Sequence, residues 1–395
     1  MAEVASLSMH PPRRKKIAYY TINDPLDKRS WSGTTYYLGR ALQQHIGDVD
    51  FLGPVPIPWV LDKACRALQK ASRLLLRSEW IPKYSLLKNV YAAWYLGRKL
   101  KGQPYDFVMA PSAAPELAYL QTKLPIVYFG DATYKIYSET YAKEFANMGA
   151  LTRWEGNHLE NKALHKSQFV VLTSQWAADS VVKDYHVAPA KVEMILLGAN
   201  IDHVPERPVI YQKLENKTLT LLFLAVDWDR KGGRLAYDAL LELHRRGIDA
   251  KLIVCGCVPP PECQHPALEV IPFLNKNLPQ DYARFVHILS TAHFLLLPTR
   301  ADCSLLVAME ANSYGMPAIT TRVGGVPDVV LDGVNGYCLP LAAEGPAYAE
   351  VIATTYADQA RYRQLIEASR ERFDRELNWS RWGERFGEAL AQHQV

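Results

Sequence analysis

The feature of this chain that most limits its fold is the alternation of short apolar runs with longer stretches of helical periodicity. Stretches such as Thr35–His45, Gln175–Tyr185 and Arg234–Arg246 have apolar residues at the spacing of a helix with one buried face. Strands that alternate with helices form parallel sheets covered on both faces, so we expect an α/β fold. The runs predicted to be strands are Lys16–Ile22, Phe107–Ala110, Ile126–Phe129, Phe169–Leu172, Glu193–Leu197, Leu219–Ala225, Lys251–Cys255, Leu268–Ile271, Phe294–Leu297 and Ala318–Thr321.

The chain is long enough for two such units, since 395 residues exceed the usual size of one core. The alternation pauses over Gly198–Lys217, where prolines and the lack of periodic apolar positions predict a linker. We therefore expect two doubly wound domains, at 1–200 and 201–375. Ligands of such folds bind at the carboxyl ends of the strands, which predicts a site in the cleft between the domains.

The stretch from Pro298 to Pro340 carries the most informative motif. A buried strand is predicted to end at Pro298, a loop carries Asp302, and a helix runs from about Ser304 to Tyr314. Asp302 and Glu310 are eight positions apart, close to two helical turns, so both can face the cleft. A carboxylate accepts paired, charge-assisted hydrogen bonds from the vicinal hydroxyls of a ribose or a hexose. The stretch therefore predicts a site for a sugar or a nucleotide.

Glycines shape the same stretch. Gly315 is expected to end the helix in a left-handed conformation, and Pro317 prevents its continuation. After the next strand, Gly324 and Gly325 allow a sharp turn into a short helix, whose free N–H groups can face an anion.

A second element, Phe223–Gly233, follows a predicted strand and opens a helix. This is the place where α/β folds receive a diphosphate. Arg230 and Lys231 supply cations for two phosphates, and the following glycines permit close approach of the backbone.

Together these motifs resemble the retaining GT-B glycosyltransferases of family four, the glycosyltransferase group 1 type. The signature of that family is two acidic residues separated by seven others, a Gly-x-Pro and a Gly-Gly turn. The matching positions are Asp302, Glu310, Gly315-Met316-Pro317 and Gly324-Gly325, with Asp332–Gly336 closing the pattern.

The resemblance implies a GT-B fold and a role for each matching residue. It implies that Glu310 binds the ribose, that the Asp302 loop meets the transferred sugar, and that Arg230 and Lys231 neutralise the leaving diphosphate. The chain departs from the family at the first acidic position, usually Glu, and at the loop after it, usually Gly-aromatic-Gly. The donor-site residues expected from the resemblance are Gly33, Ser304, Leu305, Leu306, Glu310, Gly324 and Gly325, with Cys303-Ser304-Leu305 as the departing loop.

The N-terminal half adds two loops. Ser30–Thr35 follows the first predicted strand, and its Gly33 resembles the glycine of the family's first loop, near the donor phosphates. Asp131 follows another predicted strand and can accept hydrogen bonds from sugar hydroxyls. It stands in for the histidine that many relatives have in this region, because no histidine occurs between His45 and His158. The resemblance also implies that the last helix, 376–395, packs back on the N-terminal domain. Catalytic roles are thus assigned to Arg230, Lys231, Asp302 and Asp131.

No metal and no other cofactor is expected. Asp227-Trp228-Asp229 spells the DxD pattern with which other glycosyltransferases bind a divalent ion, but the neighbouring Arg230 and Lys231 supply the same positive charge. A cluster that imitates a zinc site has spacing that matches no standard structural zinc motif: Cys255, Cys257, Cys263 and His265.

The charge of the chain is concentrated in one segment. Leu61–Lys101 has ten basic residues and two acidic ones, interleaved with Leu and Trp, although the whole chain carries only +4. Such helical segments can lie in a membrane interface, with cations on anionic headgroups. An ordinary pair of helices with a solvated basic face explains the pattern equally well. A nucleic acid is not an expected partner, because no recognised binding motif accompanies the charge.

The predicted activity is transfer of a hexose, with retention, from a UDP- or GDP-sugar to a glycan or a lipid-linked acceptor in polysaccharide or glycolipid synthesis. A sugar-nucleotide epimerase of the same fold and a non-catalytic nucleotide-sugar-binding homologue are the alternatives. We expect a cytoplasmic protein, peripheral on the membrane if the basic segment binds lipid. The first ten residues lack an apolar leader, the six cysteines are scattered, and no apolar stretch approaches the ~18–20 residues that span a bilayer.

Overall fold

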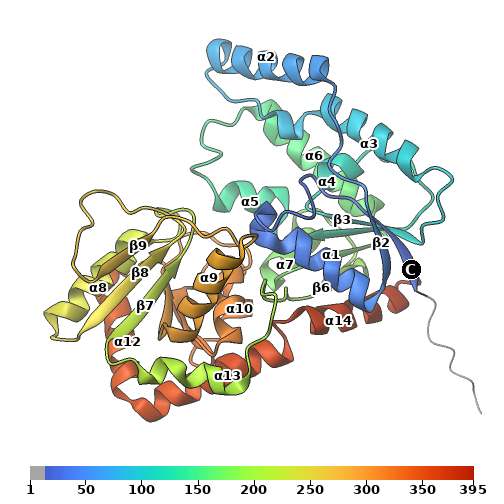
Figure 1. The fold of residues 1–395 in the computed structure, drawn as a ribbon. Coiled ribbons are helices and arrows are strands. Elements are labelled where there is room, and N and C mark those ends of the chain that lie inside the picture. The colour runs from blue at the N-terminus through green and yellow to red at the C-terminus, as the bar shows by residue number, and fades with distance from the viewer. Residues whose placement is uncertain (1–13) are drawn as a thin grey trace, which may run out of the picture.

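Two six-stranded parallel sheets organise the computed structural model, which describes residues 14–395 (Figure 1). The expectation that no leader is present falls on residues 1–10 and so lies outside the described residues. The predicted α/β class with two doubly wound units is confirmed. The first sheet has the order β2-β1-β3-β4-β5-β6 and the second β12-β11-β10-β7-β8-β9. The strands are β1 Lys15–Tyr19, β2 Gly47–Phe51, β3 Phe107–Pro111, β4 Ile126–Gly130, β5 Phe169–Leu172, β6 Val192–Met194, β7 Leu219–Leu224, β8 Ala250–Cys255, β9 Leu268–Ile271, β10 Phe294–Leu297, β11 Ala318–Thr321 and β12 Gly336–Leu339.

Helices connect the parallel strands and pack on the sheets. No helix among residues 14–395 is long and apolar enough to cross a membrane. The α-helices are α1 Thr34–His45, α2 Trp59–Leu75, α3 Leu86–Leu100, α4 Ala114–Leu117, α5 Tyr134–Thr140, α6 Ala150–Lys166, α7 Gln175–Lys183, α8 Gly233–Arg245, α9 Pro279–Thr291, α10 Leu306–Ser313, α11 Val326–Val329, α12 Gly345–Ala357, α13 Gln359–Arg375 and α14 Trp379–Gln392. Shorter 3₁₀ turns are η1 Ser30–Gly33, η2 Pro82–Tyr84, η3 Pro189–Lys191 and η4 Arg207–Glu215.

Two strands, β2 and β12, were not predicted from the sequence. Each is the outermost strand of its sheet and pairs on one side only. β2 alternates buried and exposed positions, with Asp48 and Asp50 facing outward, so it needs no continuous apolar run. The lack of a continuous apolar run thus explains why β2 was missed.

The predicted linker, Gly198–Lys217, lies between the last strand of the first sheet and the first strand of the second, and it contains the 3₁₀ helix η4. Its anchor is Lys213, which is fully buried and donates from Nζ to the carbonyls of Ile210 (2.9 Å) and Tyr314 (2.6 Å). Burial lowers the pKa of Lys213 to about 7. A lysine in an interior position breaks the apolar pattern from which a helix is recognised.

The last helix, α14, returns to the N-terminal half, as expected (Figure 1). It packs on α1, and its fully buried Trp382 stacks on Phe386 at 4.7 Å between ring centroids. Phe386 in turn contacts Phe107 of β3 and Phe169 of β5. The C-terminal segment therefore completes the core beneath the first sheet.

Candidate functional site

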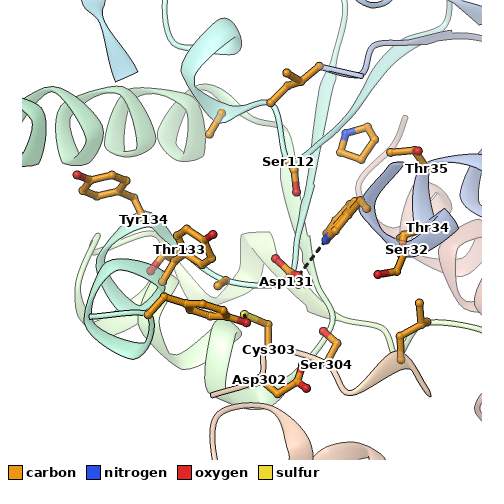
Figure 2. Close-up of a pocket in the computed structure, with 18 of the residues that line it drawn as sticks. Ser32, Thr34, Thr35, Ser112, Asp131, Thr133, Tyr134, Asp302, Cys303 and Ser304 are labelled. Atoms are coloured by element: carbon orange, nitrogen blue, oxygen red, sulfur yellow. Dashed lines mark hydrogen bonds between the residues drawn. The ribbon is translucent and has the colours of Figure 1, made fainter. Parts of the chain in front are cut away.

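A cavity of about 600 Å³ lies where the carboxyl ends of the two sheets face each other. Loops after β3 and β4 line it from the N-terminal half, and loops after β7 and β10 line it from the C-terminal half. Figure 2 shows the loop of Asp131 and Thr133 facing the loop of Asp302, Cys303 and Ser304 across this space. The cleft predicted between two domains is therefore present.

Arg230 and Lys231 enter the cavity from the loop between β7 and α8. The Arg230 guanidinium donates to the carbonyl of Ala301 at 3.1 Å, and its backbone N–H donates to Asp227 at 3.0 Å. The same guanidinium lies 5.1 Å from the ring centroid of Tyr141, which belongs to the other half. Lys231 forms an ion pair with Asp302. Both predicted cations are thus held at the start of a helix, beside a carboxylate.

The glycine before α8 is required by this arrangement. Gly232 has a φ of +75°, and a Cβ there would lie 2.0 Å from the carbonyl oxygen of Pro298. Only a glycine lets the start of α8 approach the end of β10 this closely. Lys231 and Asp302 are brought together as a result.

Asp131 follows β4 and is partly buried in the cavity. Its Oδ2 accepts a hydrogen bond of 3.2 Å from the indole N–H of Trp31, drawn as a dashed line in Figure 2. Burial raises the pKa of Asp131 to about 6, and the bond from Trp31 opposes that rise. With a pKa of about 6, this carboxyl group is mostly ionised at neutral pH, and both halves of the chain line the cavity around it. It can therefore accept hydrogen bonds from hydroxyl groups.

The loop after Asp302 connects the two halves. Ser304 Oγ and Thr173 Oγ1 share a hydrogen bond of 2.6 Å, and Cys303 Sγ lies 3.6 Å from the hydroxyl of Tyr141. Burial raises the pKa of the Cys303 thiol well above its usual value, so this sulfur is a packing atom rather than a nucleophile. Leu305 has a φ of +37°, a left-handed conformation at the place where the resembling family has glycine.

Glu310 does not line this cavity, and its placement in the cleft together with Asp302 stays a prediction. Its side chain is 1 % exposed, and its Oε1 accepts from Lys276 Nζ at 2.5 Å. Burial raises the pKa of Glu310 and Lys276 lowers it. The helix begins at Leu306 after the left-handed Leu305, so helical spacing does not relate Asp302 to Glu310.

The remaining predicted donor residues divide into two groups. Ser304, Leu305 and Leu306 line the cavity. The three glycines shape its walls instead. Gly33, with φ +89°, is the N-cap of α1. The backbone of Gly324 packs closely against the carbonyl of Asp302, and that of Gly325 against the carbonyl of Cys303.

Sequence reasoning missed several residues of this site. Lys276 lies in the loop before α9, and no motif marks it. At the N-terminal end of the cavity are Lys83, Tyr84 and Glu160, which come from η2 and α6. Burial raises the pKa of Glu160 to about 8, and the Tyr128 hydroxyl lies 3.4 Å from its Oε1. No motif in the sequence marks these residues either.

The two aspartates of the DxD pattern differ in their surroundings. Asp227 accepts from the backbone and the side chain of Arg230, and Asp229 is exposed. Within residues 14–395 no group of three or more His, Cys, Asp or Glu side chains is placed to hold a metal ion.

Part of the chain is similar in sequence to known glycosyltransferases. Residues 218–358 match the family model described as Glycosyl transferases group 1. The D-inositol 3-phosphate glycosyltransferase of Corynebacterium glutamicum (strain R) is 26 % identical over 219 residues, which cover 50 % of this chain and 51 % of that protein. The chain thus matches about half the length of this curated relative.

Solved structures match nearly the whole chain. The sucrose-phosphate synthase of Thermosynechococcus elongatus has a TM-score of 0.67, 17 % identity and coverage of 96 % of this chain and 99 % of that one. Anabaena Alr3699/HepE in complex with UDP-glucose has a TM-score of 0.60, 13 % identity and coverage of 96 % and 100 %. At these identities the likeness shows the fold: the two Rossmann-like units have the GT-B arrangement.

Proposed function

We propose that this chain is a glycosyltransferase that moves a sugar from a nucleotide-diphosphate donor to an acceptor hydroxyl, with retention of configuration. The observation that carries the proposal is the pair Arg230 and Lys231 at the start of α8, beside Asp302 in a cavity shared by both sheets. The match of residues 218–358 to Glycosyl transferases group 1 supports it.

The positive charge at the start of α8 supports a position for the donor. Its diphosphate would contact Arg230, Lys231 and the free N–H groups of α8, where both side-chain charge and helix dipole favour an anion. Drawing Lys231 toward the phosphates leaves Asp302 free to accept hydrogen bonds from the transferred sugar. The ribose hydroxyls would replace Lys276 as the hydrogen-bond donors to Glu310. UDP-sugars are the first donors to test, because Alr3699/HepE binds UDP-glucose, and GDP-sugars follow.

Retention is proposed because the motif of Asp302, Glu310, Gly315-Met316-Pro317 and Gly324-Gly325 resembles that of retaining glycosyltransferases. The acceptor oxygen forms its bond to the anomeric carbon on the face from which the diphosphate departs. The anomeric carbon–oxygen bond breaks, and a phosphate oxygen takes the acceptor's proton. Arg230 and Lys231 stabilise the charge that develops on the leaving group. Asp131 orients hydroxyl groups from the opposite wall.

Product analysis tests this function against its two alternatives. Purified protein would receive UDP-, GDP- or ADP-sugars with and without alkyl glycoside acceptors, and NMR would give the anomeric configuration of the product. A sugar-nucleotide epimerase turns over without an acceptor, but the described residues that line the cavity include no histidine for its acid-base chemistry. Donor binding without turnover would instead identify a non-catalytic homologue.

Glu310→Gln is expected to weaken donor binding by on the order of 1–3 kcal/mol, the scale of a hydrogen bond to a charged group. The change keeps the size of the side chain and removes the charge that holds Lys276. Isothermal titration with the nucleoside diphosphate would measure the loss. Equal affinity of the wild type for ribo- and 2′,3′-dideoxy nucleotides would contradict a role in ribose binding.

Activity is expected to survive EDTA, because side-chain cations rather than a metal ion neutralise the leaving group. Initial rates before and after exhaustive chelation would check this. Complete loss, with recovery in Mn²⁺ or Mg²⁺, would assign the diphosphate to an ion held by Asp227 and Asp229.

We also propose that the basic segment Leu61–Lys101 meets an anionic membrane surface. Of its helix α2, only Cys65 is buried, and Lys70 and Arg73 are exposed. We expect reversible binding to vesicles that contain phosphatidylglycerol, weakened by salt because the Debye length is about 10 Å at 0.1 M. Lys70→Glu/Arg73→Glu/Arg77→Glu should abolish flotation and leave nucleotide affinity unchanged. Wild-type protein that stays free of such vesicles at low salt would contradict the proposal.

A further inference from the structure

A second cavity, of about 680 Å³, lies beneath α2 and apart from the site described above. Its walls are the inner face of α2, the start of α3 and the start of α6. This volume falls within the ~300–1,000 Å³ typical of pockets for small ligands. The cavity is called the α2 groove below. It is lined by Ala64, Cys65, Leu68, Ala71, Ser72, Leu75, Leu76, Ser78, Trp80, Ser85, Leu86, Leu87, Gly149, Ala150, Leu151, Thr152 and Glu155.

The α2 groove is apolar because its few polar atoms are already bonded. The carboxylate of Glu155 accepts from the indole N–H of Trp80 at 2.7 Å and from the backbone N–H of Leu86 at 3.0 Å. Ser72 Oγ accepts from the backbone N–H of Trp80 at 3.0 Å. A ligand in the groove would therefore meet mainly hydrocarbon.

Large apolar side chains at the rim remain in contact with solvent. Leu75 is 80 % exposed, Leu76 71 %, Leu87 61 % and Leu151 58 %. These leucines come from three different elements and converge on one opening. A contiguous exposed apolar patch of this kind marks an interaction site.

The opposite face of α2 is basic. Successive helix positions differ by about 100°, so Lys63, Arg66, Lys70 and Arg73 project away from the face that carries Leu68 and Leu75. In Figure 1, α2 stands at the outer end of the N-terminal half, away from the sheet. A helix that is apolar toward a groove and basic on its other face fits a layer in which hydrocarbon lies beside negative charge.

One chain segment separates the α2 groove from the larger cavity. Lys83 and Tyr84 line the larger cavity, whereas the next residues, Ser85 and Leu86, line the groove. Helix α6 repeats the pattern, with Glu160 in the larger cavity and Glu155 in the groove. The groove and the larger cavity therefore lie on either side of this segment and of α6, next to the buried cluster of Tyr84, Tyr134, Phe145 and Met148.

We infer that the α2 groove binds the hydrocarbon chain of an anionic lipid, and that this lipid is the acceptor whose hydroxyl-bearing head group enters the cleft. The apolar lining accounts for the chain, the basic face of α2 for the anionic membrane surface from which the lipid is taken, and the shared segment for the position of the head. That the lipid is the acceptor rests on the proposed function, but the binding of its hydrocarbon chain can be measured independently of that function.

Photolabelling of the whole protein tests the inference. The probe is a sixteen-carbon alkyl phosphate, monomeric in buffer, with a diazirine either at the chain end or beside the phosphate. The chain-end probe is expected to label peptides 64–76 and 149–155 saturably, and the head-end probe to label Lys83 or Tyr84. Non-saturable labelling, or head-end labelling confined to the outer face of α2, would overturn it.

Two leucines next to each other provide a matched pair of variants. Leu74 is 70 % exposed and Leu75 80 %, but only Leu75 lines the groove. Leu75→Glu should reduce chain-end labelling at least tenfold, and Leu74→Glu should keep it within twofold of wild type. Ala71→Trp, which fills the groove without adding charge, should act like Leu75→Glu. Equal loss in both leucine variants would mean general surface adsorption and would overturn the inference.

Two further measurements separate the remaining readings. Thermal stabilisation by UDP should be the same in wild type, Leu74→Glu and Leu75→Glu, so a failure of the proposed function appears as lost UDP binding while labelling persists. Sedimentation velocity tests the other occupant of an apolar groove. A wild-type dimer that Leu75→Glu dissociates would show that a second copy covers the groove, and the lipid inference would be wrong.

Discussion

Replacing Arg230 and Lys231 together by alanine is expected to abolish stabilisation by nucleoside diphosphates and to lower kcat/KM by on the order of 10³-fold or more. Removing one preorganised donor to a developing charge costs a factor of about 10²–10³ in rate, and this variant removes two. The effect should fall on nucleotide binding and on rate together, because the leaving group is the same diphosphate. Differential scanning fluorimetry with UDP and GDP, and steady-state kinetics, would measure both.

The control for this variant has to separate lost charge from lost structure. Lys231→Ala leaves Asp302 without its partner, and Arg230→Ala frees the carbonyl of Ala301. Arg230→Gln/Lys231→Gln retains hydrogen-bond donors and should show nearly the same loss of nucleotide binding in a protein with a near-native melting temperature. Arg234→Ala, at an exposed position three residues after Lys231 and paired with Asp238, should bind nucleotides normally. Unchanged nucleotide affinity in the folded glutamine double variant would remove the diphosphate from this part of the cleft.

The position of Arg230 and Lys231 could be predicted because local chemistry fixes it. A strand, a glycine pair and a helix in succession leave few conformations, and Gly232 is held against Pro298 by a contact that admits no Cβ. The same holds for Gly315, whose φ of +62° ends α10 as expected. Where one residue type is needed by the backbone itself, sequence predicts structure well.

Glu310 shows where an argument from helical spacing does not apply. Its distance from Asp302 along the chain suggested a shared face, but Leu305 takes a left-handed conformation that resets the start of the helix. Its partner Lys276 comes from a loop thirty-four positions away, and nothing local marks that lysine. Ion pairs between distant elements depend on which loops the sheet brings side by side, and a single sequence does not show that. The α2 groove is a further case, since the sequence shows the basic charge of the segment but not the cavity beneath its helix.

Asp131→Asn is expected to make the fold more stable and the enzyme less active. Burial raises the pKa of this carboxyl to about 6, from 3.8 for an exposed one, so the folded protein disfavours the charged form. Removing the charge should therefore stabilise the protein at pH 7.5, by on the order of 2 kcal/mol after allowance for partial solvent contact. The corresponding rise in melting temperature is about 4–8 °C for units of this size.

The stabilisation expected for Asp131→Asn depends on pH. Because the folded pKa lies above the unfolded value, the cost of the charge is absent below pH 3.8, grows between pH 3.8 and about 6, and is constant above. The stability difference between Asp131→Asn and wild type should follow that curve in urea titrations. Exposed Asp229, changed to Asn, should give no difference at any pH.

Activity should move in the opposite direction over the same range. If ionised Asp131 accepts hydrogen bonds from a substrate hydroxyl, wild-type kcat/KM rises with pH through about 6, and Asp131→Asn loses both that rise and about 10–100-fold in rate. A destabilising carboxylate kept in the wall of the cleft, hydrogen-bonded to Trp31 and facing Asp302, is then explained by its contact with substrate. A variant that is more stable and equally active would show instead that Asp131 serves neither the fold nor the reaction, and the acceptor side of the cleft would have to be sought nearer Lys83 and Glu160.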